Sequence, residues 1–381
     1  MAKVSIIGTG TWGIALANLL DVKGHEVIAW SAIEEEVDYI QKYRKHPKLK
    51  DTHIRDGIHL TKDIQVAIDH QEVIVLAVPS IFVRSTAKTL APYINRDQII
   101  VDVAKGIEDQ TLFTMSEIIH EEINKVKSFD YGQIVALSGP THAEEVSIGL
   151  PSTIVSACTN TNNAKIVQEV FSTSFMRVYT NTDIKGVEIC GALKNIIALA
   201  AGISHGLGYG DNATAALITR GISEVSRLGL KMGCPIHTFY GLAGLGDMIV
   251  TCTSVHSRNN QCGTLIGQGK RVDEAIKEVG MVVEGINTLD AAHSMSLKYE
   301  VELPIIQSVY EVVKHNASPL ESVQSLFSRT SKAEVPFEIL EQIYESSSTT
   351  KVFVVGDESQ SLYNDLKKEN IEVIYLSNKK G

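Results

Sequence analysis

One lysine stands inside an apolar helical pattern near the middle of the chain. Lys194 lies in CGALKNIIALAAGI between Leu193, Ile196 and Ile197, and this spacing predicts a helix that is buried on most sides. A buried ammonium is costly unless it is paired, and burial lowers its pKa toward the range in which proton transfer is efficient. We interpret Lys194 as a proton-transfer group. A paired structural lysine is the alternative.

A second group of polar residues follows in the glycine-containing stretch GLAGLGDMIVTCTSVHSRNNQCG. Asp247 offers a carboxylate, and Ser257, Arg258 and Asn259 come before a helical pattern over Asn260–Gln268. The free N–H groups of a helix start, together with a guanidinium, can bind a phosphate. This stretch therefore predicts an anion site. A helix cap with a surface arginine is the alternative.

A third candidate is Lys105, in DVAKGIE, directly after the predicted strand Gln98–Val103. The stretch LAVPS, Leu76–Ser80, ends another predicted strand with a Pro-Ser turn. Open parallel sheets bind ligands at the carboxyl ends of their strands, so Lys105 is placed to reach a ligand. The alternative is a solvated loop lysine.

These groups need a scaffold, and the first half of the chain predicts one. Short β-branched runs alternate with helical patterns, which is typical of an α/β fold with a doubly wound, mostly parallel sheet. The predicted strands are Lys3–Ile7, Glu26–Trp30, Val73–Val78, Gln98–Val103, Gln133–Leu137, Thr153–Ala157 and Arg177–Tyr179.

The first predicted strand leads into the spacing Gly8-x-Gly10-x-x-Gly13, and a helical pattern over Trp12–Val22 follows. This is the context of a dinucleotide-binding loop, in which glycines make the turn, admit the pyrophosphate to the backbone and let the helix pack on the strand. A tight strand-to-helix turn without a ligand is the alternative. We predict a Rossmann-type dinucleotide-binding domain over residues 1–183.

The carboxylate expected to bind the ribose of NAD is missing from the end of the second strand. The sequence there is Trp30-Ser31-Ala32-Ile33, with neither an acid nor an arginine for a 2′-phosphate. The acidic run Glu34–Glu36 comes slightly late and is interpreted as a helix start. The sequence therefore leaves the preference between NAD and NADP undetermined.

Beyond the predicted boundary near residue 183 the pattern changes. Strand-like runs stop, and residues 184–345 predict an all-helical substrate domain. The last stretch, residues 346–381, predicts a short strand-helix-strand extension of unknown role. Its two apolar strands should dock on a sheet edge or pair with another copy, because unpaired strands are not stable in water.

Composition limits the choice of partners. The 381 residues carry a formal net charge of −10, which argues against nucleic acid and anionic membranes as partners. The five cysteines form no C-x-x-C pair, so neither a disulfide framework nor a metal site is predicted. No signal-type region or membrane span is predicted, and a cytoplasmic protein is expected.

Eight motifs then occur in a familiar order: GTGTWG, AVPS, AKGIE, SGPTHAEEV, GVEICGALKNIIALAAGISHGLGYGDNA, GLAGLGDMIVTCTS, HSRN and GMVVEG. From about Lys3 to Glu338 the chain resembles the bacterial NAD(P)-dependent glycerol-3-phosphate dehydrogenase family. The resemblance implies a dinucleotide-binding domain followed by an all-helical one, with NAD or NADP as cofactor and a small phosphorylated substrate. A homodimer is considered as the assembly.

The resemblance also implies roles for individual residues. Lys194 matches the proton donor and acceptor, and Lys105 and Asp247 match further catalytic positions. The implied substrate contacts are Lys105, Gly139, Thr141, Lys194, Asp247, Ser257, Arg258 and Asn259. The implied cofactor contacts are Gly8, Gly10, Thr11, Trp12, Gly13, Lys105, Ala143, Arg258, Val282 and Glu284. This chain departs from many relatives at Ala32 and Ile33, and in the extension.

The resulting hypothesis is the reversible reduction of dihydroxyacetone phosphate to sn-glycerol 3-phosphate, a precursor of glycerophospholipids. Lys194 would protonate the developing alkoxide, Asp247 would position Lys194, and Arg258 would anchor the phosphate. Two other functions stay open: a related two-domain dehydrogenase of a β-hydroxy or sugar acid, and a non-catalytic dinucleotide sensor. Four histidines are disfavoured as the base because Lys194 already supplies the group, namely His142, His205, His237 and His256.

Overall fold

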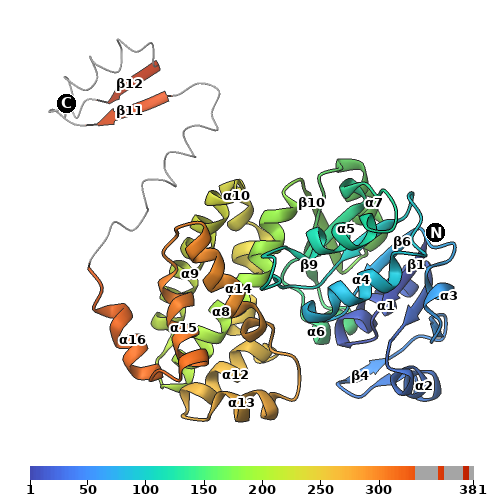
Figure 1. The fold of residues 1–381 in the computed structure, drawn as a ribbon, viewed down its shortest axis with the longest axis horizontal. Coiled ribbons are helices and arrows are strands. Elements are labelled where there is room, and N and C mark those ends of the chain that lie inside the picture. Colours follow the sequence, from blue (N-terminus) through green and yellow to red (C-terminus); the bar gives the residue numbers. More distant parts are fainter. Residues whose placement is uncertain (331–350, 356–371, 377–381) are drawn as a thin grey trace. The chain divides into compact units, whose positions relative to one another are not determined.

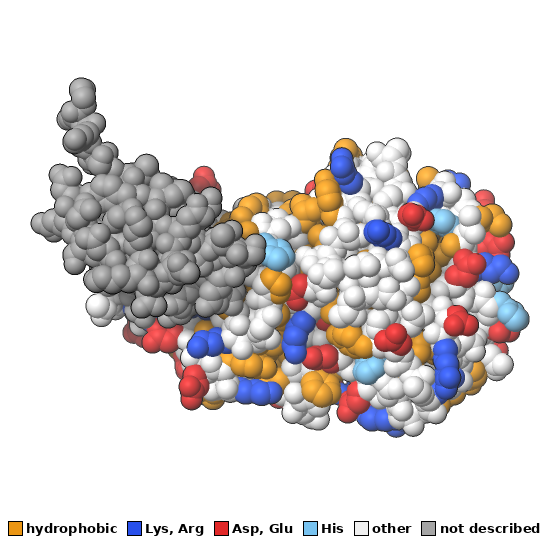
Figure 2. Space-filling model, turned by 90° about the horizontal axis from the view of Figure 1, so that it is seen from above, with side chains coloured by type: hydrophobic (Ala, Val, Ile, Leu, Met, Phe, Trp, Pro, Cys, Tyr) orange, Lys and Arg blue, Asp and Glu red, His pale blue; other side chains and the backbone are white. Residues whose placement is uncertain are grey.

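The computed structural model describes residues 1–330, 351–355 and 372–376. Residues Met1–Arg329 form one compact unit, and the two C-terminal strands belong to a second one. On the coloured face in Figure 2, basic and acidic side chains are mixed across the surface.

An eight-stranded sheet, in the order β10-β9-β8-β7-β6-β1-β2-β5, forms the N-terminal half of the first unit (Figure 1). Its neighbouring strands are parallel, except that β8 and β9 run antiparallel. The strands are β1 (Lys3–Ile7), β2 (Glu26–Trp30), β5 (His59–Thr61), β6 (Val73–Leu76), β7 (Ile99–Asp102), β8 (Ile134–Ser138), β9 (Ser152–Ala157) and β10 (Met176–Asn181). The mostly parallel, doubly wound sheet predicted from the sequence is confirmed.

All seven predicted strands are present, with ends that differ by at most two residues from the prediction. The edge strand β5 was not predicted, and neither was the antiparallel hairpin of β3 (Lys45–His46) and β4 (Leu49–His53). β3 and β5 have only two and three residues. Strands this short show no readable alternation of apolar and polar residues.

Helices cover each face of the sheet, because successive residues of each strand point to opposite sides. Ile6 packs with one set of helices and Ile7 with the other. The first face is covered by α1 (Thr11–Val22), α2 (Glu34–Tyr43), α6 (Ala143–Ser147) and α7 (Thr161–Phe171). The second face is covered by α3 (Ile64–Ile68), α4 (Val83–Leu90) and α5 (Met115–Asn124).

The C-terminal half of the unit is helical throughout its described residues. Its helices are α8 (Ile184–Gly206), α9 (Asp211–Lys231), α10 (Ile236–Phe239), a π-helical turn (Leu242–Gly246), α11 (Asp247–Thr253), α12 (Arg258–Gly267), α13 (Val272–Val279), α14 (Glu284–Lys298), α15 (Pro304–His315) and α16 (Pro319–Phe327). The predicted all-helical second domain is confirmed.

α8 is the central helix of this half. It contacts α9, α11, α12, α14 and α15, and nearly all of its residues are buried. Among the described residues it is the one helix that is long and apolar enough to cross a membrane, and its whole apolar stretch is buried inside the protein. All five cysteines are also buried and free of disulfides.

Glycines let the backbones of α8 and α12 approach each other closely. A Cβ atom at Gly202 would lie 2.1 Å from the carbonyl oxygen of Asn260, and one at Gly263 would lie 2.2 Å from that of Leu199. Neither contact could be relieved by a side-chain movement, because the atoms that would clash belong to the backbone. The relative position of the two helices therefore depends on these glycines.

In the second unit, β11 (Lys351–Val355) and β12 (Glu372–Leu376) pair in parallel, with Lys351 opposite Glu372. The two strands were predicted, but their pairing with each other was not. Docking on a sheet edge or on another copy stays a prediction. The connection between them is long enough for the crossover that parallel pairing requires. The helix predicted between them lies outside the described residues.

The close contact between α8 and α12 leads to a stability prediction. Replacing Gly263 by alanine should lower the free energy of unfolding by roughly 1–3 kcal/mol, because the two helix backbones must move apart. Gly210→Ala is the matched control, since a Cβ there meets nothing within 4 Å and φ is −94°. Denaturant unfolding of the two variants measures the difference. Equal stabilities would contradict the backbone contact.

Candidate active site

A cleft runs between the carboxyl edge of the sheet and the helical half of the first unit. On the sheet side it is lined by the loops that follow β1, β6, β7 and β8. On the helical side it is lined by residues of α8, α11, α12 and the start of α14. The cleft thus lies where parallel α/β sheets bind their ligands.

Lys194 lies at the floor of this cleft and is only 4% exposed. Its Nζ atom is 3.0 Å from Oδ1 of Asp247 and donates a hydrogen bond to Oγ1 of Thr251 at 2.5 Å. Burial lowers the pKa of Lys194 to about 8, although the carboxylate of Asp247 partly opposes this shift. The Lys194 ammonium is therefore paired, and its pKa lies close to neutral pH.

Asp247 is shared between two lysines. Its Oδ2 atom lies 2.6 Å from Nζ of Lys105, which also donates to the carbonyl oxygen of Gly139 at 3.3 Å. Burial raises the pKa of Asp247, but the two ammonium groups more than offset this and the net pKa is lowered. The three side chains therefore carry one negative and two positive charges, with Lys194 and Asp247 buried and Lys105 partly exposed.

The start of α11 positions this carboxylate. Asp247 is its first residue, directly after the π-helical turn, and Thr251 follows one helical turn later. Thr251 Oγ1 donates to the carbonyl oxygen of Asp247 at 2.5 Å while it accepts from Lys194. The sequence analysis did not identify Thr251. Its spacing of four residues from Asp247 on one helix face was the available signal.

The three loop glycines have distinct surroundings. Gly8 has φ +115°, and a Cβ there would lie 2.7 Å from the carbonyl oxygen of Ala77. A Cβ at Gly13 would lie 2.0 Å from the carbonyl oxygen of Gly8, whereas one at Gly10 would meet nothing within 4 Å. Gly8 and Gly13 thus allow the turn and the packing. Gly10 leaves open space beside the first turn of α1, which fits the phosphates of a dinucleotide.

The predicted anion site lies on the helical side of the cleft. Ser257 caps α12, its Oγ atom accepting from the N–H of Asn260, and the exposed Arg258 lines the cleft. Asn259 also lines the cleft but is buried. Its Nδ2 atom donates to Oδ1 of Asn195 at 3.0 Å, and its Oδ1 atom accepts from the N–H of Gly285 at 2.9 Å.

Asn195, which the sequence analysis missed, therefore fixes the anion site relative to the lysine. It directly follows Lys194 on α8, is 4% exposed and lines the cleft. Through Asn259 it links α8 to α12, and Asn259 in turn links α12 to the start of α14. A buried asparagine in an apolar helix was the signal for this link.

A carboxylate from the helical half crosses the cleft. Glu284, the first residue of α14, accepts from the backbone N–H of Ser80 at 3.1 Å and from its hydroxyl at 2.5 Å. Ser80 belongs to the Pro-Ser turn after β6. Thr141, Ala143 and Val282 line the same cleft.

The structure thus brings the predicted site residues to one place. All of them line the cleft except three glycines: Gly8, Gly13 and Gly139. Of the histidines that were disfavoured as the base, His142 and His256 line the cleft, and their rings are 5.9 Å apart. Burial and the nearby Lys194 lower the pKa of His142, so its ring is neutral.

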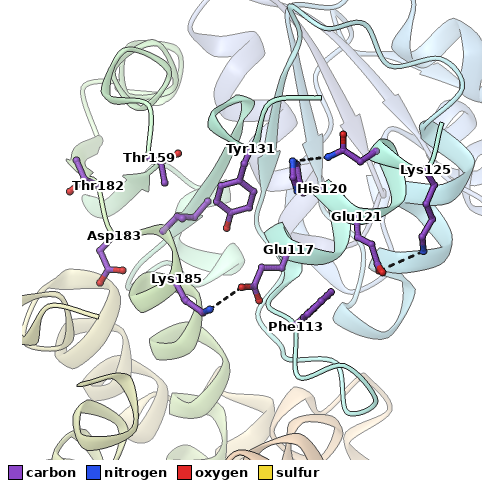
Figure 3. A pocket seen from close by; sticks show the side chains of 12 residues that line it. Phe113, Glu117, His120, Glu121, Lys125, Tyr131, Thr159, Thr182, Asp183 and Lys185 are labelled. Atoms are coloured by element: carbon purple, nitrogen blue, oxygen red, sulfur yellow. Dashed lines mark hydrogen bonds and ion pairs between the residues drawn. The ribbon is translucent and has the colours of Figure 1, made fainter. Parts of the chain in front are cut away.

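A second pocket lies on the surface between α5 and the start of α8 (Figure 3). Lys185 of α8 pairs there with Glu117 of α5 at 2.9 Å. None of the predicted site residues lines this pocket. Its ion pair ties the helical half to the helices behind the sheet.

Comparison with known families assigns the two halves separately. Residues 3–164 match the sequence model described as NAD-dependent glycerol-3-phosphate dehydrogenase N-terminus, and residues 183–324 match the model of its C-terminus. The chain belongs to this dehydrogenase family. The resemblance inferred from the ordered motifs is confirmed.

Individual members of the family agree with this assignment. Glycerol-3-phosphate dehydrogenase (NAD(P)+) 2 of Lactobacillus delbrueckii subsp. bulgaricus is 55% identical over 335 residues, which cover 88% of this chain and 99% of the relative. The Fusobacterium nucleatum glycerol-3-phosphate dehydrogenase (NAD(P)+) is 49% identical over 336 residues, with the same shares covered. The crystal structure of glycerol-3-phosphate dehydrogenase from Coxiella burnetii superposes with a TM-score of 0.82 at 33% identity, covering 86% of this chain and 99% of that one.

The shared carboxylate leads to a prediction about the lysine. Asp247→Asn should lower the pKa of Lys194 below its value of about 8, because burial then acts without the opposing negative charge. A pH titration of the lysine side chains by NMR measures this pKa. Asp290→Asn, which removes an exposed partner of Lys314, is the control and should leave Lys194 unchanged. An unchanged or higher pKa in Asp247→Asn would contradict the pairing.

Proposed function

We propose that this chain is an NAD(P)-dependent glycerol-3-phosphate dehydrogenase, which reduces dihydroxyacetone phosphate reversibly to sn-glycerol 3-phosphate and so supplies glycerophospholipid synthesis. The observation that carries the proposal is the Lys194–Asp247–Lys105 charge group, in which Lys194 and Asp247 are buried, in a cleft that the glycine loop and Arg258 also line. Family membership supports the same reaction.

The fit of the glycine loop supports a position for the cofactor. The open space at Gly10 and the first turn of α1, with Thr11 and Trp12, would receive the pyrophosphate. Ala143, Val282 and Glu284 would contact the rest of the dinucleotide from across the cleft. When bound, a reduced nicotinamide supplies the hydride for ketone reduction.

The two lysines would act on the carbonyl oxygen. Lys194 in its ammonium form donates a proton from Nζ to the oxygen as negative charge develops there, and accepts it back in the reverse direction. Lys105 polarises the same carbonyl. Because Asp247 neutralises only one of the two ammonium groups, the site keeps a net positive charge that stabilises an alkoxide.

The far end of the substrate would bind at the start of α12. Arg258 and the free N–H groups of this helix start would hold the phosphate, and Ser257 keeps the helix start in place. Asn259 uses one N–H and its oxygen within the protein, so its second N–H is left for the substrate. Gly139 and Thr141 would border the substrate on the sheet side. A phosphate anchored here orients the reacting carbon toward Lys194.

Two features of the whole chain are proposed alongside the reaction. We place the domain boundary at residue 183, between the end of β10 at Asn181 and the start of α8 at Ile184. The end of the helical domain at residue 345 lies outside the described residues. Five buried cysteines without a disulfide support the reducing cytoplasm as the location.

A substrate panel tests the function. Oxidation of NADH and NADPH should be followed with dihydroxyacetone phosphate, with dihydroxyacetone, and with unphosphorylated keto acids that match a β-hydroxy or sugar acid dehydrogenase. Only the phosphorylated ketone should be turned over efficiently, since Arg258 is placed to bind a phosphate. Turnover of a keto acid would favour the related dehydrogenase, and cofactor binding without any turnover would favour the sensor.

In the same assay, Lys194→Met should reduce kcat by a factor of roughly 10²–10⁴, the usual range for loss of a general acid, with cofactor affinity unchanged. Lys185→Met is the matched control. It removes a lysine of the same helix that lies outside the cleft and pairs with Glu117. Near-normal turnover in Lys194→Met would refute the assignment of the proton donor.

The pH dependence follows from the pKa of Lys194, about 8. The reduction needs the ammonium form, so kcat/KM for dihydroxyacetone phosphate should be level below that pH and fall about tenfold per pH unit above it. The reverse reaction needs the neutral amine and should rise through the same pH. Initial rates in each direction from pH 6 to 10 measure the two limbs. If the forward and reverse rates changed in the same direction with pH, the assignment of Lys194 would be contradicted.

A further inference from the structure

A carboxylate from α2 reaches the glycine loop, although the sequence analysis interpreted it only as part of a helix start. Glu36 accepts hydrogen bonds from Oγ1 of Thr9 at 2.7 Å and from Oγ of Ser31 at 2.9 Å, both through its Oε2 atom. Thr9 lies between the first two loop glycines, and Ser31 directly follows β2. Glu36 also lines the cleft.

This is the region in which a dinucleotide-binding domain places the acid that binds the adenosine ribose, near the end of the second strand. The sequence has no acid directly after Trp30, so the sequence analysis assigned no residue to the ribose position. In the structure, α2 begins at Glu34 and its first turn returns Glu36 to the end of β2. The carboxylate arrives from the helix instead of from the strand.

Glu36 is ionised in this setting. Its interaction with His46 is the largest influence and lowers the pKa of Glu36, burial raises it in part, and the hydroxyls of Thr9 and Ser31 lower it again. Each of these neighbours donates to the charged form or favours it. The negative charge is therefore stable at neutral pH.

The neighbouring His46 does not cancel this charge. Its Nδ1 atom accepts a hydrogen bond from the backbone N–H of Lys48 at 3.1 Å, so that nitrogen carries no proton. Its other ring nitrogen, Nε2, faces the carboxylate and lies 3.6 Å from Oε1 of Glu36. Glu36 keeps its full negative charge toward the cleft.

Cations that could receive a 2′-phosphate are scarce around this carboxylate. Within residues 31–43, which connect β2 to the end of α2, Glu36 alone lines the cleft. Lys48 lines it from the β3–β4 hairpin, but its Nζ atom donates to the carbonyl oxygen of Gly280 at 2.8 Å on the other side of the cleft. The charge around Glu36 in the cleft is therefore negative.

We propose that Glu36 makes the enzyme selective for NAD(H) by accepting hydrogen bonds from the adenosine ribose hydroxyls and repelling the 2′-phosphate of NADP(H). The inference rests on the proposed function only in that the cleft must bind a nicotinamide dinucleotide. A carboxylate next to a 2′-phosphate places like charges within a few ångströms, which should disfavour NADP(H) by roughly tenfold to a hundredfold.

Direct binding tests the selectivity without turnover. NADH and NADPH are titrated into the full chain, and their fluorescence gives the two Kd values. The wild type should bind NADH at least about tenfold more tightly. Glu36→Gln keeps the size of the side chain and an acceptor oxygen for Thr9 and Ser31, and should reduce this ratio by about tenfold, mainly through tighter binding of NADPH. Glu35→Gln, one residue away and exposed, is the matched control and should keep the wild-type ratio.

Two further measurements separate this inference from the proposed reaction. Competition by ADP and by adenosine 2′,5′-bisphosphate probes only the adenosine side, and the wild type should prefer ADP. Raising the salt concentration should weaken the discrimination between NADH and NADPH in the wild type, because salt screens charge repulsion. This measurement needs no variant.

Two outcomes overturn the proposal. The first is a wild type that binds NADPH as tightly as NADH, which would make Lys48 the phosphate receptor. The second is an unchanged ratio of the two Kd values in folded Glu36→Gln. If the selectivity is found but dihydroxyacetone phosphate is not reduced, the proposed function fails and the role of Glu36 stands.

Discussion

The buried carboxylate of Asp247 between two ammonium groups is the interaction on which the site depends. Lys105 comes from a loop of the sheet, Lys194 from the central helix, and Asp247 from a third element, so one charge group connects the two halves of the unit. Removing Asp247 would leave two ammonium groups next to each other without a counter-charge, which is far more costly than losing a surface ion pair. The same imbalance, two cations against one anion, gives the site its positive potential.

Close backbone contacts fix the start of α12 relative to this charge group. Gly202 and Gly263 let α8 and α12 touch, and the amide of Asn259 joins them through Asn195. The start of α12 is therefore held at a set position relative to Lys194. In the proposed reaction, binding of the phosphate at one end of the substrate and proton transfer at the other would both depend on this helix pair.

Much of this fold could be predicted from the sequence because its periodic signals are strong. Most of the seven predicted strands are buried and rich in apolar residues, and Lys194 was conspicuous because its helix is otherwise apolar. Family motifs then identified the residues of the cleft. Local patterns could not show the pairing of Lys105 with Asp247, which are 142 residues apart in the chain.

The residues and elements that the sequence analysis did not identify also have physical reasons for being missed. Asn195, Thr251 and Glu36 act through partners that only the folded chain brings near, and Glu36 was correctly placed at a helix start without its direction being known. The edge strand β5 is too short to show a period. The C-terminal strands were predicted, but sequence alone could not show that they would pair with each other.

The burial of α8 has a consequence for synthesis of the protein. The helices that cover it, α9, α11, α12, α14 and α15, all come later in the chain. At typical translation rates the ribosome needs on the order of ten seconds to add them. Until then, this apolar segment of 23 residues has native cover only from the sheet domain, at β8. The nascent chain is thus most exposed to aggregation, and most dependent on chaperones, after the sheet domain has been made and before the helical one is finished.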